Sequence, residues 1–194
     1  EKKYSVLHAA GSSHLKSTDI VVECWKKYNL PKLTIIQHGY GLENLKKYIN
    51  LSTIKNNENI ELLTEPLEAK EIWSLQEKTF MHLCPSMAEG YGHYINESRM
   101  TKNLCITTNF PPMNELITPD CGILIEPKSM TKKKNDYPLA IIDIEDINKA
   151  ILDIDDKKSK KLASNAYEKY IIDTNEFITL TSPVGKIKCI KDLF

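Results

Sequence analysis

Short apolar runs that alternate with helix-like segments are the feature that most constrains this sequence. About six runs predict buried strands, and they cover residues 4–10, 32–37, 60–64, 79–84, 104–107 and 122–125. Segments in which apolar residues recur with helical spacing separate most of them. Strands and helices that alternate in this way predict an α/β fold, a Rossmann-like doubly wound parallel sheet of about six strands with helices on both faces.

Glycine-bearing turns follow three of the predicted strands. Gly11 follows the first strand, Gly39 and Gly41 follow the second, and Gly90 and Gly92 follow the fourth. The carboxyl ends of parallel strands meet at one edge of a sheet, which is where doubly wound folds bind their ligands. The sequence therefore predicts a ligand site at this edge.

The fourth strand leads into the most informative loop. Pro85-Ser86 ends the apolar run, and a helix-like segment that carries Glu97 follows the glycines. The first amides of a helix lack intrahelical partners and lie at the positive end of its dipole, so they favour a phosphate. Glu97 could accept hydrogen bonds from a diol such as a ribose, and Glu89 would point at the group attached to the phosphate. A capped surface helix with a glycine-rich entry fits the same spacing.

The net charge indicates which class of ligand to expect, and the cysteines indicate which cellular compartment. Lys+Arg and Asp+Glu number 26 each, so no overall field attracts nucleic acid or an anionic membrane, and a small ligand is favoured. The five cysteines form no CxxC pair and mostly lie in apolar runs, which favours a reducing, cytoplasmic compartment. No apolar run reaches the roughly 20 residues of a membrane helix, so we expect a soluble chain. We find no cluster with metal-ligand spacing and expect no metal or cofactor.

Length and composition predict how the 194 residues divide. We expect one domain over residues 1–172 and a C-terminal extension of uncertain structure over residues 173–194. Helices are expected at 141–154 and 160–172, and the basic segment 127–138 is expected to be a mobile surface loop. The absence of an initial methionine suggests a fragment of a longer protein.

Several motifs together resemble a known enzyme family. They are the Gly11 to Lys16 loop, the Pro85-Ser86 strand end, and Glu89 and Glu97 with Glu-Gly-Tyr-Gly between them. The sequence resembles the C-terminal, sugar-nucleotide-binding half of family 4 (group 1) retaining glycosyltransferases of the GT-B fold. The segments 109–117 and 121–125 also look like the family's, and the matching pieces span most of residues 4–172.

The resemblance implies roles for particular residues. Glu89, facing the transferred sugar, and Lys16, contacting the diphosphate, would be the catalytic residues, and Glu97 would hold the ribose. The remaining donor-binding residues would lie in the two loops, at Gly11, Ser12, Ser13, Gly90, Tyr91, Gly92 and His93. Family members retain the configuration of the sugar, require no metal, and bind the acceptor through an N-terminal domain. The partners implied are a sugar nucleotide and such a domain, in the same polypeptide or in a separate subunit.

One departure from the family pattern keeps two hypotheses open. Many relatives carry an arginine where this chain has Ser12 and Ser13, and a hydroxyl replaces neither the charge nor the bidentate geometry of a guanidinium. The chain is therefore either the donor-binding domain of a retaining hexosyltransferase or a non-catalytic nucleotide-sugar-binding or partner module. A dinucleotide oxidoreductase is disfavoured because residues 10–14 lack GxGxxG spacing. Neither the base, the sugar nor the acceptor can be read from these residues.

Overall fold

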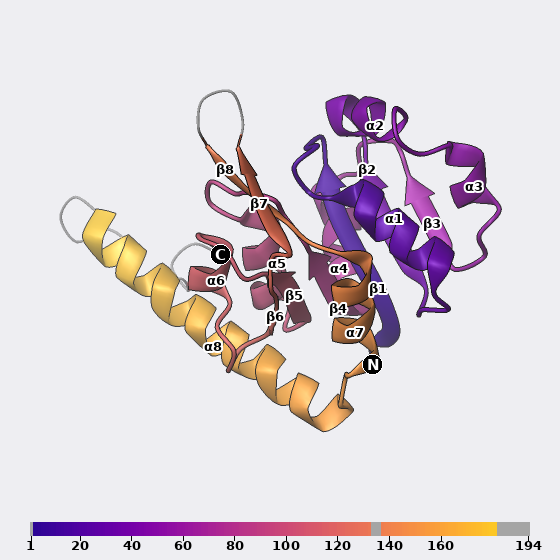
Figure 1. The fold of residues 1–194 in the computed structure, drawn as a ribbon. Helices are drawn as coiled ribbons and strands as arrows, with labels where there is room; N and C mark the ends of the chain where they lie inside the picture. The colour runs from indigo at the N-terminus through magenta and orange to yellow at the C-terminus, as the bar shows by residue number, and fades with distance from the viewer. Residues whose placement is uncertain (1, 133–136, 182–194) are drawn as a thin grey trace.

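The computed structural model describes residues 2–132 and 137–181. Within these ranges, six parallel strands form one sheet in the order β3-β2-β1-β4-β5-β6 (Figure 1). Their bounds are Lys3–Gly11 (β1), Leu33–Gln37 (β2), Ile60–Leu63 (β3), Thr79–Cys84 (β4), Leu104–Thr108 (β5) and Ile123–Ile125 (β6). The predicted doubly wound α/β fold is confirmed, and each predicted strand is found within a residue or two of its expected bounds.

The helices cover both faces of the sheet. Their bounds are Thr18–Lys27 (α1), Gly39–Leu45 (α2), Leu51–Lys55 (α3), Ala69–Lys78 (α4), His93–Met100 (α5), Met113–Leu116 (α6), Ile144–Leu152 (α7) and Asp156–Thr181 (α8). The strand order runs outward from β1 in both directions, so right-handed connections place α1 to α3 and α4 to α6 on opposite faces. α7 packs against α1, and α8 packs against α5.

The core lies around the central strands because both faces of the sheet are covered. Val6 of β1 pairs with Leu33 of β2 on one side and Met81 of β4 on the other, and all three are almost fully buried. Every residue of β4 is buried. Strands buried on both faces are mostly apolar rather than alternating, which is why nearly continuous apolar runs marked them in the sequence.

The basic segment after β6 differs from its prediction. A mobile loop was expected over residues 127–138, but in the described part of this segment Ser129–Lys132 (β7) pairs antiparallel with Pro138–Ile141 (β8), so the expectation was wrong there; residues 133–136 lie outside the described residues. Leu139 and Ala140 are buried, and the amide of Ala140 donates to the carbonyl of Met87 (2.8 Å). In Figure 1 these strands extend past the end of the sheet at which α2 lies. The segment therefore borders the loop that follows β4.

Smaller differences concern helix ends. Apolar residues recur with helical spacing from Leu42 to Ile49, which predicts one helix, but α2 ends at Leu45 and α3 begins only at Leu51.

Proline favours the first position of a helix, which predicts a helix that begins at Pro66. Instead α4 begins at Ala69, and the Glu71 carboxylate accepts from the amide of Glu68 (2.8 Å). The spacing of Trp73 with Ile72 and Leu75 predicts that it faces inward, yet 39% of it is exposed.

Helix α8 is longer than the helix predicted for residues 160–172, and it continues through the predicted domain boundary to residue 181. The buried Arg99 of α5 anchors it by bonding the carbonyl of Ala166 (3.4 Å) and pairing with Asp173. Residues 182–194 of the predicted extension lie outside the described residues, so the division into two parts stays a prediction.

The buried histidines His8 and His82 should make stability depend on pH. Burial lowers the pKa of His8 to about 4 and that of His82 to about 3, whereas an unfolded histidine titrates near about 6.5. Because the folded values are lowered, the stability contributed by the neutral rings is complete above the unfolded pKa and is lost as pH falls toward the folded values. Between about pH 6.5 and 5, we expect the free energy of unfolding in urea to fall by up to about 1.4 kcal/mol per pH unit for each ring. His82→Gln should remove about half of this slope, and an unchanged slope would contradict the explanation.

Candidate functional site

The loop after β1 is a closed turn that directs Lys16 toward the carboxyl edge of the sheet. Gly11 has φ +58°, a conformation that glycine adopts without strain, and its carbonyl accepts from the amide of His38 (2.9 Å). The amide of Ser13 donates to the carbonyl of Ala10 (3.3 Å), and the amide of Leu15 donates to Oγ of Ser13 (3.2 Å). These bonds fix the path of the chain from Gly11 to Lys16.

The loop after β4 is attached to that first loop. The amide of Met87 donates to the carbonyl of Leu15 (2.8 Å), and the carbonyl of Met87 accepts from Ala140 of β8. One residue thus joins the loop after β1, the loop after β4 and the β7–β8 pair. The loops lie next to each other because β1 and β4 are neighbours in the sheet at the point where the strand order reverses.

The predicted catalytic residues Lys16 and Glu89 meet in an ion pair. Only 13% of the Lys16 side chain and 10% of the Glu89 side chain are exposed. Glu89 also accepts from Oγ of Ser86 (2.5 Å), and Nζ of Lys16 lies 3.7 Å from the ring centroid of Tyr94. The structure therefore places a cation, a carboxylate and a hydroxyl together beside the first turn of α5.

Helix α5 opens toward this cluster. Gly92 precedes it with φ +74°, and the first intrahelical hydrogen bond runs from the amide of Ile95 to the carbonyl of Gly92 (3.0 Å). The amides of His93 and Tyr94 lie ahead of this bond, at the positive end of the helix dipole. Gly90, Tyr91 and His93 are exposed, whereas Gly92 is buried. The motif is therefore open at its tip and packed at its base.

Glu97 bonds a neighbouring helix and not the Lys16–Glu89 ion pair. Its Oε2 accepts from Nε2 of Gln76 of α4 (2.7 Å), and the side chain is half-buried in the second turn of α5. Ser12 is exposed, while the hydroxyl of Ser13 is engaged within the loop. The ribose-binding role of Glu97 and the donor-binding roles of the two serines stay predictions.

The sequence did not indicate a role for Tyr94, for Gln37 or for the hydroxyl of Ser86, which had marked only the end of a strand. Oγ of Ser86 lies 2.5 Å from Oη of Tyr94. Burial, with the Cys84 thiol and the Glu89 carboxylate nearby, raises the pKa of Tyr94 well above its ordinary value, so the phenol stays protonated. Tyr94 follows the glycine motif directly, and that position at a helix start was the one signal available for it.

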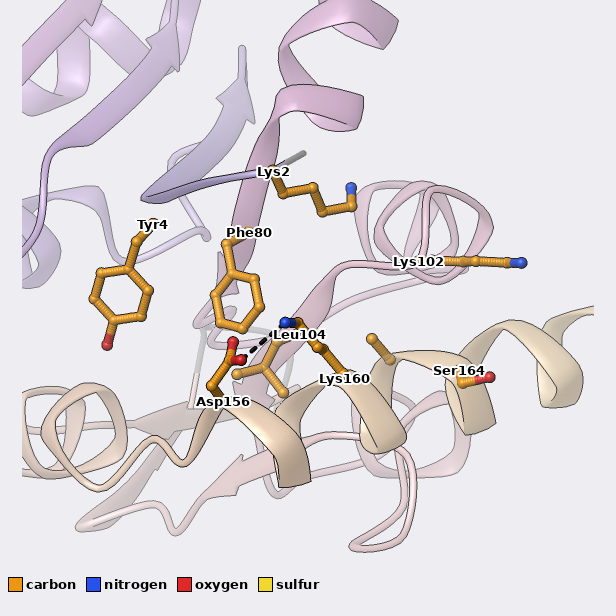
Figure 2. A pocket seen from close by; sticks show the side chains of 9 residues that line it. Lys2, Tyr4, Phe80, Lys102, Leu104, Asp156, Lys160 and Ser164 are labelled. Carbon is orange, nitrogen blue, oxygen red and sulfur yellow. Dashed lines mark hydrogen bonds and ion pairs between the residues drawn. The ribbon is translucent and has the colours of Figure 1, made fainter.

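A cavity lies at the opposite, amino edge of the sheet (Figure 2). It encloses about 420 Å³ between the Tyr4 and Phe80 rings, Leu104, and the first turns of α8. Its lysines all have partners: Nζ of Lys2 donates to the carbonyl of Glu77 (3.0 Å), Lys102 lies over the Tyr167 ring, and Lys160 pairs with Asp156 (2.8 Å). With its charges engaged, this cavity offers hydrophobic volume but no converging reactive groups, so we place the site at the carboxyl edge.

The described residues contain neither a metal cluster nor a helix able to cross a membrane. No group of three or more His, Cys, Asp and Glu residues among them could hold a metal ion. No helix among them combines the length and apolar character that crossing a bilayer demands. The described cysteines, Cys24, Cys84, Cys105 and Cys121, are free and buried, and Cys189 lies outside the described residues.

Gly92 and Gly90 should respond differently to alanine. A Cβ on Gly92 would lie 2.6 Å from Cδ1 of Leu116 on a backbone with positive φ, whereas a Cβ on Gly90 meets nothing within 4 Å. We expect Gly92→Ala to lower the free energy of unfolding, measured in urea, by about 1–2 kcal/mol, mainly through the strain of a positive φ, because the half-buried Leu116 side chain can move aside. Gly90→Ala is the matched control and should change it by less than about 0.5 kcal/mol. Equal effects of the two variants would show that the base of the motif is not packed as described.

Comparison with known proteins identifies the fold. No family model matches the sequence, and no curated protein matches it. The C-terminal domain of a glycosyl transferase group 1 family protein, LpcC from Francisella tularensis, superposes with TM-score 0.64 and 21% identity, over 95% of this chain and 88% of that one. HepE from Anabaena, solved with UDP and glucose, gives 0.65 and 19% over 93% of this chain and 48% of that one. Sucrose-phosphate synthase from Thermosynechococcus elongatus gives 0.69 and 15% over 87% and 41%.

At these identities the likeness is one of fold. The chain spans most of the isolated LpcC domain but less than half of HepE and of the synthase. The resemblance read from the motifs is confirmed at this level. The chain has the fold of the C-terminal domain of a group 1 glycosyltransferase, one half of a GT-B architecture.

Proposed function

We propose that this chain is the donor-binding domain of a retaining glycosyltransferase. It binds a sugar nucleotide through its diphosphate at the carboxyl edge of the sheet, and an acceptor-binding domain completes the transfer. The observation that carries the proposal is the meeting of Lys16, Glu89 and the amino end of α5 at the point where the strand order reverses. A cation, a carboxylate and a helix amino end coincide there, at the strand-order reversal where doubly wound folds bind nucleotides.

The chemistry of glycosyl transfer fits these groups. Negative charge develops on the departing diphosphate, and Lys16 with the first amides of α5 can neutralise it. When a phosphate reaches Lys16, the ion pair with Glu89 opens, and the released carboxylate can accept hydrogen bonds from sugar hydroxyls. The family resemblance adds retention of configuration, no metal requirement, and Glu97 as the ribose partner.

The choice of first ligand comes from the structural relatives. HepE has been solved with UDP and glucose and with UDP-glucose, and a TarM variant with UDP. We therefore propose UDP-sugars as the first donors to test, followed by GDP- and ADP-sugars. The free, buried thiols favour a reducing compartment such as the cytoplasm, where sugar nucleotides are available to an enzyme of this kind.

A non-catalytic module is the alternative, and the first loop supports it. Ser12 and Ser13 stand where many relatives have an arginine, so Lys16 is the one cation that this loop supplies. A single ammonium forms fewer directed hydrogen bonds to a diphosphate than a lysine and a guanidinium together. Such a module would bind sugar nucleotides without transferring the sugar.

Substitution of the predicted donor-binding residues tests binding. We expect Lys16→Ala to weaken the binding of UDP-glucose roughly tenfold to hundredfold by calorimetry, because a charge-assisted hydrogen bond is lost. Glu97→Ala should weaken it roughly tenfold, through loss of bonds to the ribose. Lys26→Ala, on the exposed side of α1, is the matched control and should leave affinity unchanged. Failure of the wild-type chain to bind any UDP-, GDP- or ADP-sugar would reject the proposal.

Glu89→Gln separates binding from transfer. The change removes the charge that pairs with Lys16, so we expect UDP to bind at least as tightly as to the wild type. In the complete assembly with its acceptor half, the same change should lower the rate of sugar transfer by roughly 100-fold or more, since the carboxylate faces the sugar. A wild-type assembly that binds the sugar nucleotide but transfers no sugar would support the non-catalytic alternative.

A further inference from the structure

A buried side-chain amide lies directly under the first loop. Gln37 is the last residue of β2, and its relative exposure is 0%. Ala9 of β1 pairs with Ile36, but Gly11 rather than Ala10 pairs with Gln37, so an irregularity in the pairing brings the end of β2 beneath the loop. Burial of an amide destabilises a fold unless its hydrogen bonds are made, so the partners of Gln37 indicate what holds it there.

Both polar atoms of this amide have partners. Nε2 of Gln37 donates to the carbonyl of Ser13 (2.9 Å), and Oε1 accepts from the hydroxyl of Thr18. Nε2 of His8 lies 3.0 Å from that hydroxyl, and the other ring nitrogen, Nδ1, bonds the carbonyl of Leu83 (2.9 Å). A chain of buried polar contacts thus runs from β4 through β1 and α1 to β2 and ends on a peptide of the first loop, with the single hydroxyl hydrogen of Thr18 donated to Gln37.

The lack of space at Gly41 is independent evidence that the Ser13 peptide is tightly packed. A Cβ at Gly41 would lie 2.0 Å from Nε2 of Gln37, 2.7 Å from the Ser13 carbonyl oxygen and 2.9 Å from the Ser12 carbonyl carbon. Real Cβ atoms do not approach other atoms so closely, so only glycine leaves room for this contact. The first turn of α2 therefore closes over the Gln37 amide and the Ser13 peptide together.

The orientation of the Ser13 carbonyl matters for an anion. Bonded to a fully buried amide, the oxygen points into the protein, so its negative end faces away from a phosphate at the carboxyl edge. Ser13 also sets the path to Lys16, because its Oγ accepts from the amide of Leu15 and the carbonyl of Leu15 accepts from Met87. A rotated Ser13 peptide would present an acceptor to the anion and shift Lys16.

We propose that Gln37 is a positioning residue for diphosphate binding, which acts through the Ser13 peptide and touches no ligand itself. The inference rests on the proposed function and deepens it. Without the contacts of Gln37 and Gly41, only a fraction of molecules would have the loop over residues 11–16 in its anion-binding conformation. These contacts keep the loop in that conformation. Apparent affinity scales with the fraction of molecules in the competent arrangement.

The test compares the side-chain amides of the buried Gln37 and the half-buried Asn57. Gln37→Met keeps the length of the side chain and removes its hydrogen bonds, so we expect the dissociation constant for UDP to rise roughly tenfold. Asn57→Leu is the matched control: its Nδ2 bonds the carbonyl of Trp25 (3.3 Å) at the amino edge, and UDP affinity should stay unchanged while stability falls. Amide hydrogen exchange over residues 12–16 should accelerate in Gln37→Met only. In the complete assembly, KM for UDP-glucose should rise while kcat stays near wild type.

A second variant covers the case in which Gln37→Met does not fold. Gly41→Ala keeps the Gln37 side chain, but the added Cβ would lie 2.0 Å from its Nε2 and 2.7 Å from the Ser13 carbonyl oxygen. The variant should therefore break the bond between the two groups and weaken UDP binding to a similar degree. Equal UDP affinity in wild type and in a folded Gln37→Met or Gly41→Ala variant would overturn the positioning role and leave the proposed function intact. Failure of the wild type to bind UDP, GDP or ADP would overturn both.

Discussion

The parallel pairing of β1 with β4 is the constraint on which the rest of the site depends. Val6 pairs with Met81 although many residues separate them, because the chain builds one side of the sheet first and then returns to build the other. Both strands point the same way, so the loops after them emerge side by side and can bond through Met87 and Leu15. Lys16 and Glu89 meet for this reason. The β7–β8 pair then adds its own bond to Met87 and borders the site.

Electrostatics at this edge favour an anionic ligand over a neutral one. The Lys16–Glu89 pair is largely buried, so water and salt screen its attraction less than they screen a surface ion pair. A neutral sugar carries no charge that could replace the Glu89 carboxylate as the partner of Lys16. Under the proposed function, a diphosphate would bring the charge that replaces Glu89, and the amino end of α5 would stabilise it further. Arrival of the phosphate would then release the carboxylate.

Much of the fold was predictable because strands covered on both faces are mostly apolar. Strand β4, for example, is buried throughout and has the bounds that its apolar run predicted. The β7–β8 pair was missed because Ser129–Lys132 is polar and exposed, so nothing local marks it as a strand. Its partner β8 carries the buried Leu139 and Ala140, and the amide of Ala140 bonds the carbonyl of Met87, which is a contact between distant segments. Trp73 looked like a core residue for the opposite reason: its spacing is helical, but α4 leaves it partly uncovered.

The sequence by itself determined the order of strands and helices, the edge at which the glycine loops gather, and the presence there of Lys16 and Glu89. Only the tertiary structure decided that Lys16 takes Glu89 as its partner over the Tyr94 ring, that Glu97 bonds Gln76, and that Gln37 lies beneath Ser13. The physical reason is the sequence separation of the interacting residues. Periodicity records how deeply each segment is buried, whereas a hydrogen bond between distant residues depends on strand register and side-chain rotamer, which no local pattern contains.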